Sequence, residues 1–123
     1  MTTNHQKTAK IYMSMRLVSE ANARGHWAGG HARAKAQKAQ VLGEWLRVMR
    51  PVVSPPCTVT ITRIAPRRMD CDNLQRAAKA VRDAAAEHIV QADDGDERIT
   101  WDYKQVKGKA KTYAVSIEVV ACD

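Results

Sequence analysis

The segment that most constrains the fold is an alternating, β-branched stretch that runs into a long helical pattern and then into a second alternating stretch. Residues 57–64 (CTVTITRI) are β-branched and alternate as a half-buried strand does. Residues 72–89 place apolar side chains at helical spacing, and residues 98–106 alternate again. A strand, helix and strand in this order normally join two neighbouring parallel strands by a crossover, so we expect the two strands to pair.

Two more alternating stretches and one more helix complete the predicted elements. Residues 10–18 alternate cleanly, and residues 112–120 do so again at the end of the chain. Residues 32–50 consist of good helix formers. The apolar stripe expected to be buried on this helix is Val41, Leu42, Trp45, Leu46 and Met49.

These elements predict an α/β fold of the mixed α+β type, with one small mixed four-stranded sheet and two main helices. The predicted order is strand, helix, strand, helix, strand, strand. We expect a flexible tail over residues 1–9 and a single domain over residues 10–123. No apolar run approaches the roughly twenty residues of a membrane span, and the polar N-terminus lacks a signal-peptide core. We therefore expect a cytoplasmic protein with no membrane partner.

The charge is strongly basic overall and locally acidic. The chain carries 20 Lys and Arg against 13 Asp and Glu, for a net charge of +7. Part of the acidic charge is concentrated between the second predicted strand and the third, at Asp70, Asp72, Asp83, Asp93, Asp94 and Asp96. A basic shell around an acidic focus suits a polyanion that meets a metal-loaded centre. The plainer alternative is a soluble basic protein whose charge only keeps it dispersed.

The acids form two groups on either side of the predicted second helix. Asp70 and Asp72 lie two residues apart in extended chain and point the same way, while Asp93 and Asp94 lie in a turn. We expect the crossover to bring one of the latter beside the former. Mg²⁺, or Mn²⁺ in its place, prefers such carboxylates together with water and phosphate oxygens. One or two bound ions activate water and stabilise the leaving oxygen of a phosphodiester.

Each part of this predicted site also has a structural alternative. Lys79, on the polar face of the helix, can donate to the charge that develops on a phosphorane. It can equally form a surface ion pair with Asp83, worth a few tenths of a kcal/mol. Asp72 and Asn73 can simply cap the helix, and the acidic turn can be an ordinary turn. The clustering of acids in a basic chain favours a site over several unrelated roles.

Basic residues around the acids are predicted to bind nucleic-acid phosphates. Two of them immediately precede the acidic motif, one follows it on the helix, and the others lie in a loop, on the first helix and in a predicted hairpin loop over residues 107–111. An ordinary solvated basic surface is the alternative for the loops and the first helix. The predicted phosphate-binding residues are Arg24, Lys35, Arg67, Arg68, Arg76, Lys107 and Lys109.

The motif region, over about residues 70–107, resembles the RusA family of Holliday junction resolvases, which are crossover junction endodeoxyribonucleases. The shared features are D-x-D-N-L beginning at Asp70, a lysine four residues before an aspartate on the following helix, and a D-D pair before the next strand. The resemblance implies a Mg²⁺-dependent homodimer. Such an enzyme resolves four-way DNA junctions by paired symmetric nicks in recombination and repair.

The resemblance also assigns roles to individual residues. The three positions that match the family's catalytic acids are Asp70, Asp72 and Asp94. Asp93 competes with its neighbour for the third position, and Lys79 matches the catalytic lysine by its spacing to Asp83. One departure concerns this lysine, which in the family follows D-N-L more closely. Arg76 occupies that nearer position, one helical turn before Lys79, so either residue can serve.

Two other functions remain open. Asp102-Tyr103-Lys104 fits the short D/E-x-K signature of another class of metal-dependent nuclease, whose DNA substrate would differ. A basic nucleic-acid-binding protein without catalysis is a separate class. Replacing Asp70 with asparagine discriminates, because an enzyme keeps binding and loses cleavage whereas a pure binder is unaffected or binds more tightly.

Overall fold

A computed structural model describes residues 8–18, 27–49 and 51–122 of the chain. The strands are β1 (Thr8–Met13), β2 (Cys57–Ala65), β3 (Ile99–Lys107) and β4 (Ala114–Ala121). The helical elements are α1 (Trp27–Val48), α2 (Cys71–Ala77), α3 (Lys79–Ala84) and the π-helical η1 (Ala85–Val90). The predicted class is confirmed: this is a small α+β fold with a mixed four-stranded sheet. None of the helices in the described ranges combines the length and apolar character needed to cross a bilayer.

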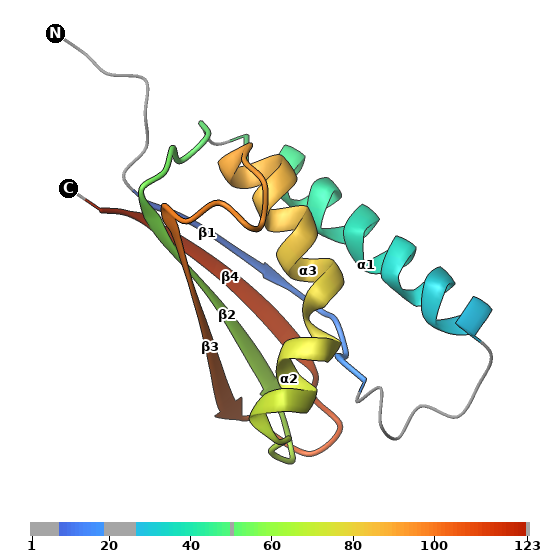
Figure 1. Ribbon diagram of the computed structural model, residues 1–123. Helices are drawn as coiled ribbons and strands as arrows, with labels where there is room; N and C mark the ends of the chain where they lie inside the picture. The colour runs from blue at the N-terminus through green and yellow to red at the C-terminus, as the bar shows by residue number, and fades with distance from the viewer. Residues whose placement is uncertain (1–7, 19–26, 50, 123) are drawn as a thin grey trace, which may run out of the picture.

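The strands lie in the order β1-β4-β2-β3 (Figure 1). β4 is antiparallel to both of its neighbours, and β2 is parallel to β3. Cys57 pairs with Ile99 and Ala65 with Lys107, so the two parallel strands run side by side over their whole length. The predicted crossover between these strands is therefore confirmed.

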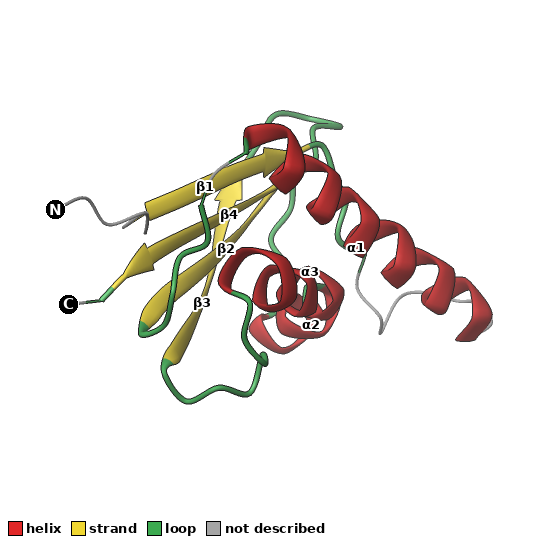
Figure 2. Ribbon diagram, turned by 90° about the horizontal axis from the view of Figure 1, so that it is seen from above, coloured by secondary structure: helices red, strands yellow, loops and turns green. Residues whose placement is uncertain are grey.

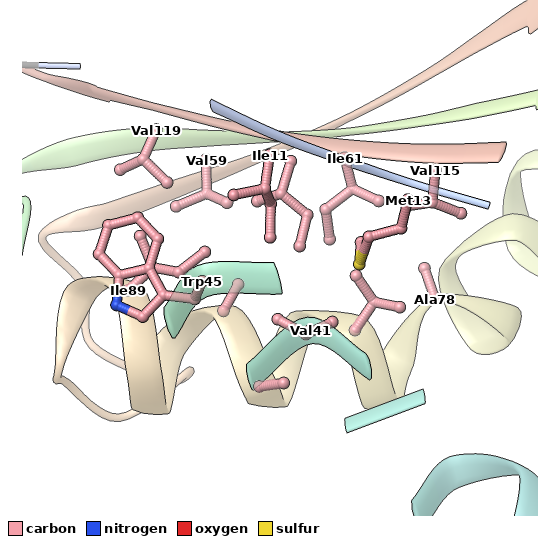
Figure 3. Close-up of a cluster of buried hydrophobic side chains, with 14 of the residues drawn as sticks. Ile11, Met13, Val41, Trp45, Val59, Ile61, Ala78, Ile89, Val115 and Val119 are labelled. Carbon is pink, nitrogen blue, oxygen red and sulfur yellow. The ribbon is translucent and has the colours of Figure 1, made fainter. Parts of the chain in front are cut away.

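All helices cover one face of the sheet, and the main core lies between the two layers (Figure 2). β2 alternates buried and half-buried residues along its length, and Val59 and Ile61 are fully buried. Each such side chain contributes roughly 1.5–3 kcal/mol when buried. Many residues of α2, α3 and η1 are alanine, and these small side chains let the helical backbone approach the sheet closely. Figure 3 shows the core residues Ile11, Met13, Val41, Trp45, Val59, Ile61, Ala78, Ile89, Val115 and Val119.

β1 begins earlier and ends sooner than the alternation predicted. Thr8 and Ala9, assigned to the tail, pair with β4, while residues 1–7 lie outside the described part. The strand ends at Met13 because its partner there is Val115, next to the first residue of β4, so no further partner strand remains. Residues 14–18 keep the alternation in their burial without belonging to the sheet.

α1 begins at Trp27, five residues before the predicted start at residue 32, and ends at Val48. Its predicted buried stripe is confirmed for Val41 and Trp45 and wrong for two other residues. Leu46 is 62% exposed, because it lies about 140° around the helix from Val41 at about 100° per residue. Met49 is 85% exposed and follows the last helical residue in a left-handed conformation with φ 51°.

The predicted hairpin between the last two strands is wrong. β3 and β4 do not pair, because β2 lies between them. The loop after Lys107 crosses the end of β2 instead, and the Gly108 amide donates to the Ala65 carbonyl oxygen at 2.9 Å. The predicted single helix over 72–89 is also divided, because Ala78 leaves helical geometry between α2 and α3.

Candidate functional site

The loop between β2 and α2, which carries the basic and acidic motif, is held by two side chains of the sheet. Gln105 binds both backbone groups of Met69: Oε1 accepts from the amide at 2.9 Å, and Nε2 donates to the carbonyl at 2.7 Å. Arg63 Nη1 donates to the Arg67 carbonyl at 2.6 Å and to Gln105 Oε1 at 3.2 Å. Arg63 and Gln105 are register partners on parallel strands, so the sheet itself positions this loop.

The loop delivers two uncommitted carboxylates at the start of α2. Asp70 occupies the N-cap position with φ −61° and ψ 150°, and its carbonyl accepts from the Leu74 amide at 2.8 Å. Its side chain makes no capping hydrogen bond, and Asp72 is exposed in the first helical turn. The prediction that both acids lie in extended chain is therefore wrong for Asp72, because the helix begins at Cys71. Within the described ranges neither carboxylate has a hydrogen bond or an ion pair. Helix capping by Asp72 or Asn73 is therefore not what the structure contains, since Asp70 holds the cap position.

Two acids of the turn after η1 have structural roles. Asp93 Oδ1 accepts from the Gly95 amide at 3.3 Å. Asp96 accepts from the Arg98 side chain at 2.7 and 3.1 Å and from its amide at 2.9 Å. The side-chain hydrogen bond from Arg98 is the main reason that the pKa of Asp96 falls from 3.8 to about 2. The ordinary-turn alternative thus accounts for these two residues.

Asp94 has a different environment, created by a cation that packs against an aromatic ring. Its carbonyl oxygen accepts from Trp101 Nε1 at 3.0 Å and from Arg82 Nη2 at 3.1 Å. Its carboxylate Oδ2 lies 3.4 Å from Arg82 Nε, without hydrogen-bond geometry, and 4.0 Å from Lys79 Nζ. Arg82 also lies 4.5 Å above the Trp101 ring and donates to the Tyr103 hydroxyl at 3.2 Å. Asp94 is therefore anchored mainly through its backbone.

Arg76 and Lys79 line one hollow of about 320 Å³ together with Asp94. This placement agrees with the expectation that both cations share a helix face. Lys79 Nζ also lies 3.2 Å from Asp83 Oδ1, and Lys38 lies 3.9 Å from the other oxygen of that carboxylate. The surface ion pair considered for Lys79 therefore exists, and at such an exposed site it contributes little stability.

The structure does not bring the predicted acids into one ligand group. Among the residues it describes, no set of three or more His, Cys, Asp or Glu is placed to hold a metal ion. The topology explains this, because Asp70 follows the end of β2 whereas the acidic turn precedes β3 at the opposite end of the sheet (Figure 1). The turn folds back as far as Lys79 and the hollow that Asp94 shares with Arg76, and neither Asp70 nor Asp72 lines that hollow.

The chemistry of the donors fits a hard divalent cation in part. Asp70 and Asp72 offer free carboxylate oxygens, the ligands that Mg²⁺ prefers. Asp93 and Asp94, the candidates for the third acid, have oxygens engaged by protein groups. The two free acids would thus hold an ion with water and a substrate phosphate as its remaining ligands.

Several predicted phosphate-binding residues gather at the end of β2. Arg67 and Arg68 are exposed and line a hollow of about 350 Å³ with Lys107. Lys35 is exposed on α1, and Lys109 is exposed in the loop after β3. The remaining predicted residue, Arg24, lies outside the described residues.

The D-x-K residues lie on the edge strand β3, where Asp102 and Lys104 line a hollow of about 540 Å³ with Arg68 and Cys71. Asp102 and Lys104 are exposed on β3 and alternate with Trp101 and Tyr103, which face the helical layer. Side chains two apart on a strand share a face, so this pair lies on the face without helices. No other acid completes a metal-holding group with Asp102 in the described ranges.

The residues that support the site were missed by the motif-based prediction. Arg63 stands at an inward position of β2, in the alternating series that includes Val59 and Ile61. A charged residue is unusual at such a buried position. Gln105 is likewise a polar residue at an inward position of β3, two residues after Tyr103. An inward polar residue at the end of a strand was therefore the available signal.

Comparison with known proteins adds no family assignment. No family model matches the chain, and no curated protein matches its sequence. The functional proposal below therefore depends on the residues, their geometry and the motif resemblance.

Proposed function

We propose that this protein is a Mg²⁺-dependent, structure-selective DNA endonuclease of the RusA type, which resolves four-way junctions. The observation that carries the proposal is the pair of free carboxylates on Asp70 and Asp72. They stand at the start of α2, on a loop fixed by Arg63 and Gln105 and bordered by exposed arginines. Free acids within a strongly basic surface suit the cleavage of a polyanion.

Each group has a defined task in this proposal. Asp70 and Asp72 would hold the ion, which when bound would supply an activated water and charge neutralisation at the leaving oxygen. Arg67 and Arg68 bind phosphates of the strand and orient it toward these acids. Lys79 or Arg76, which lie on the same helix face, provides the cation that stabilises the charge developing on the phosphorane. Asp94 lies beside Lys79.

The proposal includes a homodimer and a branched DNA substrate. Paired symmetric nicks in a four-way junction need two equivalent sites, and one chain carries only one copy of the motif. A two-fold dimer supplies the second site by symmetry. The net charge of +7 on each chain favours association with the dense phosphates where four arms meet.

A synthetic four-way junction, incubated with and without Mg²⁺, tests the proposal. We expect paired symmetric nicks only with the ion, and we expect Asp70→Asn to bind the junction without cutting it. Asp102→Asn is the matched control, because it removes another exposed carboxylate, on the edge strand β3, and should retain cleavage. Loss of cleavage in the Asp102 variant alone would move the active site to the D-x-K motif. A junction and a linear duplex both left intact with Mg²⁺ and Mn²⁺ would refute the nuclease.

One observation favours a second candidate, a junction-binding protein that does not cut. The carboxylate of Asp94 lies next to Arg82 and Lys79, and no three-acid group forms among the described residues. A binder would shift the junction in a gel with or without divalent ions. It would also bind equally or more tightly after Asp70→Asn, since a negative charge near the phosphates is removed.

A further inference from the structure

A buried arginine near the start of α2 lacks a counter-ion. Arg63 is 8% exposed, and its Nε is buried without a hydrogen-bond partner. Both hydrogen bonds of this side chain come from Nη1 and go to uncharged oxygens, and no carboxylate in the described ranges forms an ion pair with it. A buried charge without a compensating partner is costly, so an anion at this position would be strongly favoured.

Further cations surround the same guanidinium. Arg16, Arg67 and Arg68 line a hollow of about 520 Å³ with Arg63, and Asp70 is the one acid among the described residues that line it. Burial lowers the pKa of the Arg63 guanidinium and the Arg16 charge lowers it further, while Tyr113 acts in the opposite sense. Mutual repulsion of this kind is relieved when an anion enters between the cations.

One of these cations is positioned independently of the loop. The Arg16 guanidinium lies 4.3 Å from the centre of the Tyr113 ring, a cation–π contact that restricts its conformations. Arg16 follows β1 and Tyr113 precedes β4, so their contact spans two chain segments other than the acidic motif. The hollow is therefore lined by three separate parts of the chain, which are residues 16–18, Arg63 of β2 and the loop that follows β2.

We propose that this hollow, named here the Arg63 pocket and defined by Arg16, Arg63, Arg67 and Arg68, binds a single phosphate group. Guanidinium groups bind phosphate through parallel charge-assisted hydrogen bonds, and four guanidinium-bearing side chains line this one hollow. The phosphate can be inorganic or part of a nucleic-acid strand, because both present the same oxyanion. Assignment to a DNA strand next to Asp70 rests on the proposed function, whereas the pocket itself does not.

A structural role alone does not explain these residues. The Nη1 of Arg63 fastens the loop through the Arg67 carbonyl, and this bond needs neither Nε nor Arg16. Arg16→Gln thus removes a pocket cation while leaving every hydrogen bond of the loop in place. Lys10→Gln, at an exposed position on β1, removes the same charge elsewhere and is the matched control.

Titration of the full chain with inorganic phosphate, followed by NMR of the arginine Nε–Hε groups, tests the pocket. We expect the Arg63 signal to shift saturably with phosphate and not with chloride at equal ionic strength. Arg16→Gln should weaken phosphate binding roughly tenfold, as the loss of one charge-assisted contact does, while Lys10→Gln should change it less than about twofold. Absence of a saturable shift, or equal effects of the two variants, overturns the proposal. Arg63→Lys is a second variant, and circular dichroism checks its folding.

Competition by a single-stranded oligonucleotide distinguishes the two sources of phosphate. Displacement of inorganic phosphate from the Arg63 pocket supports a strand phosphate, and persistence of the phosphate-bound signal overturns that assignment. The measurement needs neither Mg²⁺ nor cleavage. A protein that binds phosphate but cuts no junction therefore refutes the nuclease and keeps the pocket. A protein that cuts junctions without binding phosphate here refutes the pocket alone.

Discussion

Replacement of Gln105 by leucine should destabilise the protein by about 3 kcal/mol, from three hydrogen bonds at about 1 kcal/mol each. Two of these bonds hold the backbone of Met69, and in the third the Gln105 Oε1 accepts from the buried Arg63. Leucine has a similar size but leaves both backbone groups of Met69 without these hydrogen bonds in a partly buried place, whereas Arg63 keeps its bond to the Arg67 carbonyl. The expected loss is a large share of the roughly 5–15 kcal/mol that stabilises a typical domain.

Urea unfolding followed by tryptophan fluorescence measures this change. Lys104→Leu is the control, since it places the same side chain at the adjacent, exposed position of β3 and should change stability by less than about 0.5 kcal/mol. Amide hydrogen exchange over residues 70–74 should also accelerate in the Gln105 variant, because the start of α2 loses its attachment. If both variants unfold within about 0.5 kcal/mol of the wild type, the loop is not held by Gln105 and the argument fails.

Three further outcomes follow from the acidic turn and from the core. Because Arg98 holds the pKa of Asp96 at about 2 against 3.8 ordinarily, Asp96→Asn should be less stable than the wild type above pH 3.8. Thermal melts should show this difference vanish as the pH falls through about 2, and a difference that does not change with pH would contradict the pairing. Ile61→Ala should cost about 2–5 kcal/mol in urea unfolding, since the side chain is fully buried. Leu46→Ala should change the same measurement by less than about 0.5 kcal/mol, and equal losses would contradict the one-sided core.

The sequence predicted the architecture well because periodicity reports burial directly. The alternation of β2 and β3 and the length of the helical segment between them led to the correct parallel pairing. Local signals failed where pairing depends on distant strands. Lysines and a glycine after Lys107 look like a hairpin loop, but only the position of β2 decides that β4 cannot lie beside β3. Likewise, helical spacing included Leu46 in the stripe, although the sheet covers a narrower face of α1.

The candidate site was predictable where residues are close in sequence. Asp70 and Asp72 are both exposed and unpaired at the start of α2, although Asp72 lies in the first helical turn and not in the extended chain that was predicted. The third acid was less accessible to such reasoning. A parallel crossover returns the chain to the opposite end of the sheet, so the residues before β3 start far from those after β2. How far the turn folds back along the helix depends on Arg82, which no motif identifies.

The way Asp94 is fastened determines what that acid can do. Its carbonyl oxygen is fixed by Trp101 and Arg82 at hydrogen-bond distance, whereas its carboxylate has only ion pairs at 3.4 and 4.0 Å. Ion pairs that are partly exposed and lack hydrogen-bond geometry contribute at most about 1 kcal/mol. The carboxylate can therefore exchange its partners while the turn stays in place.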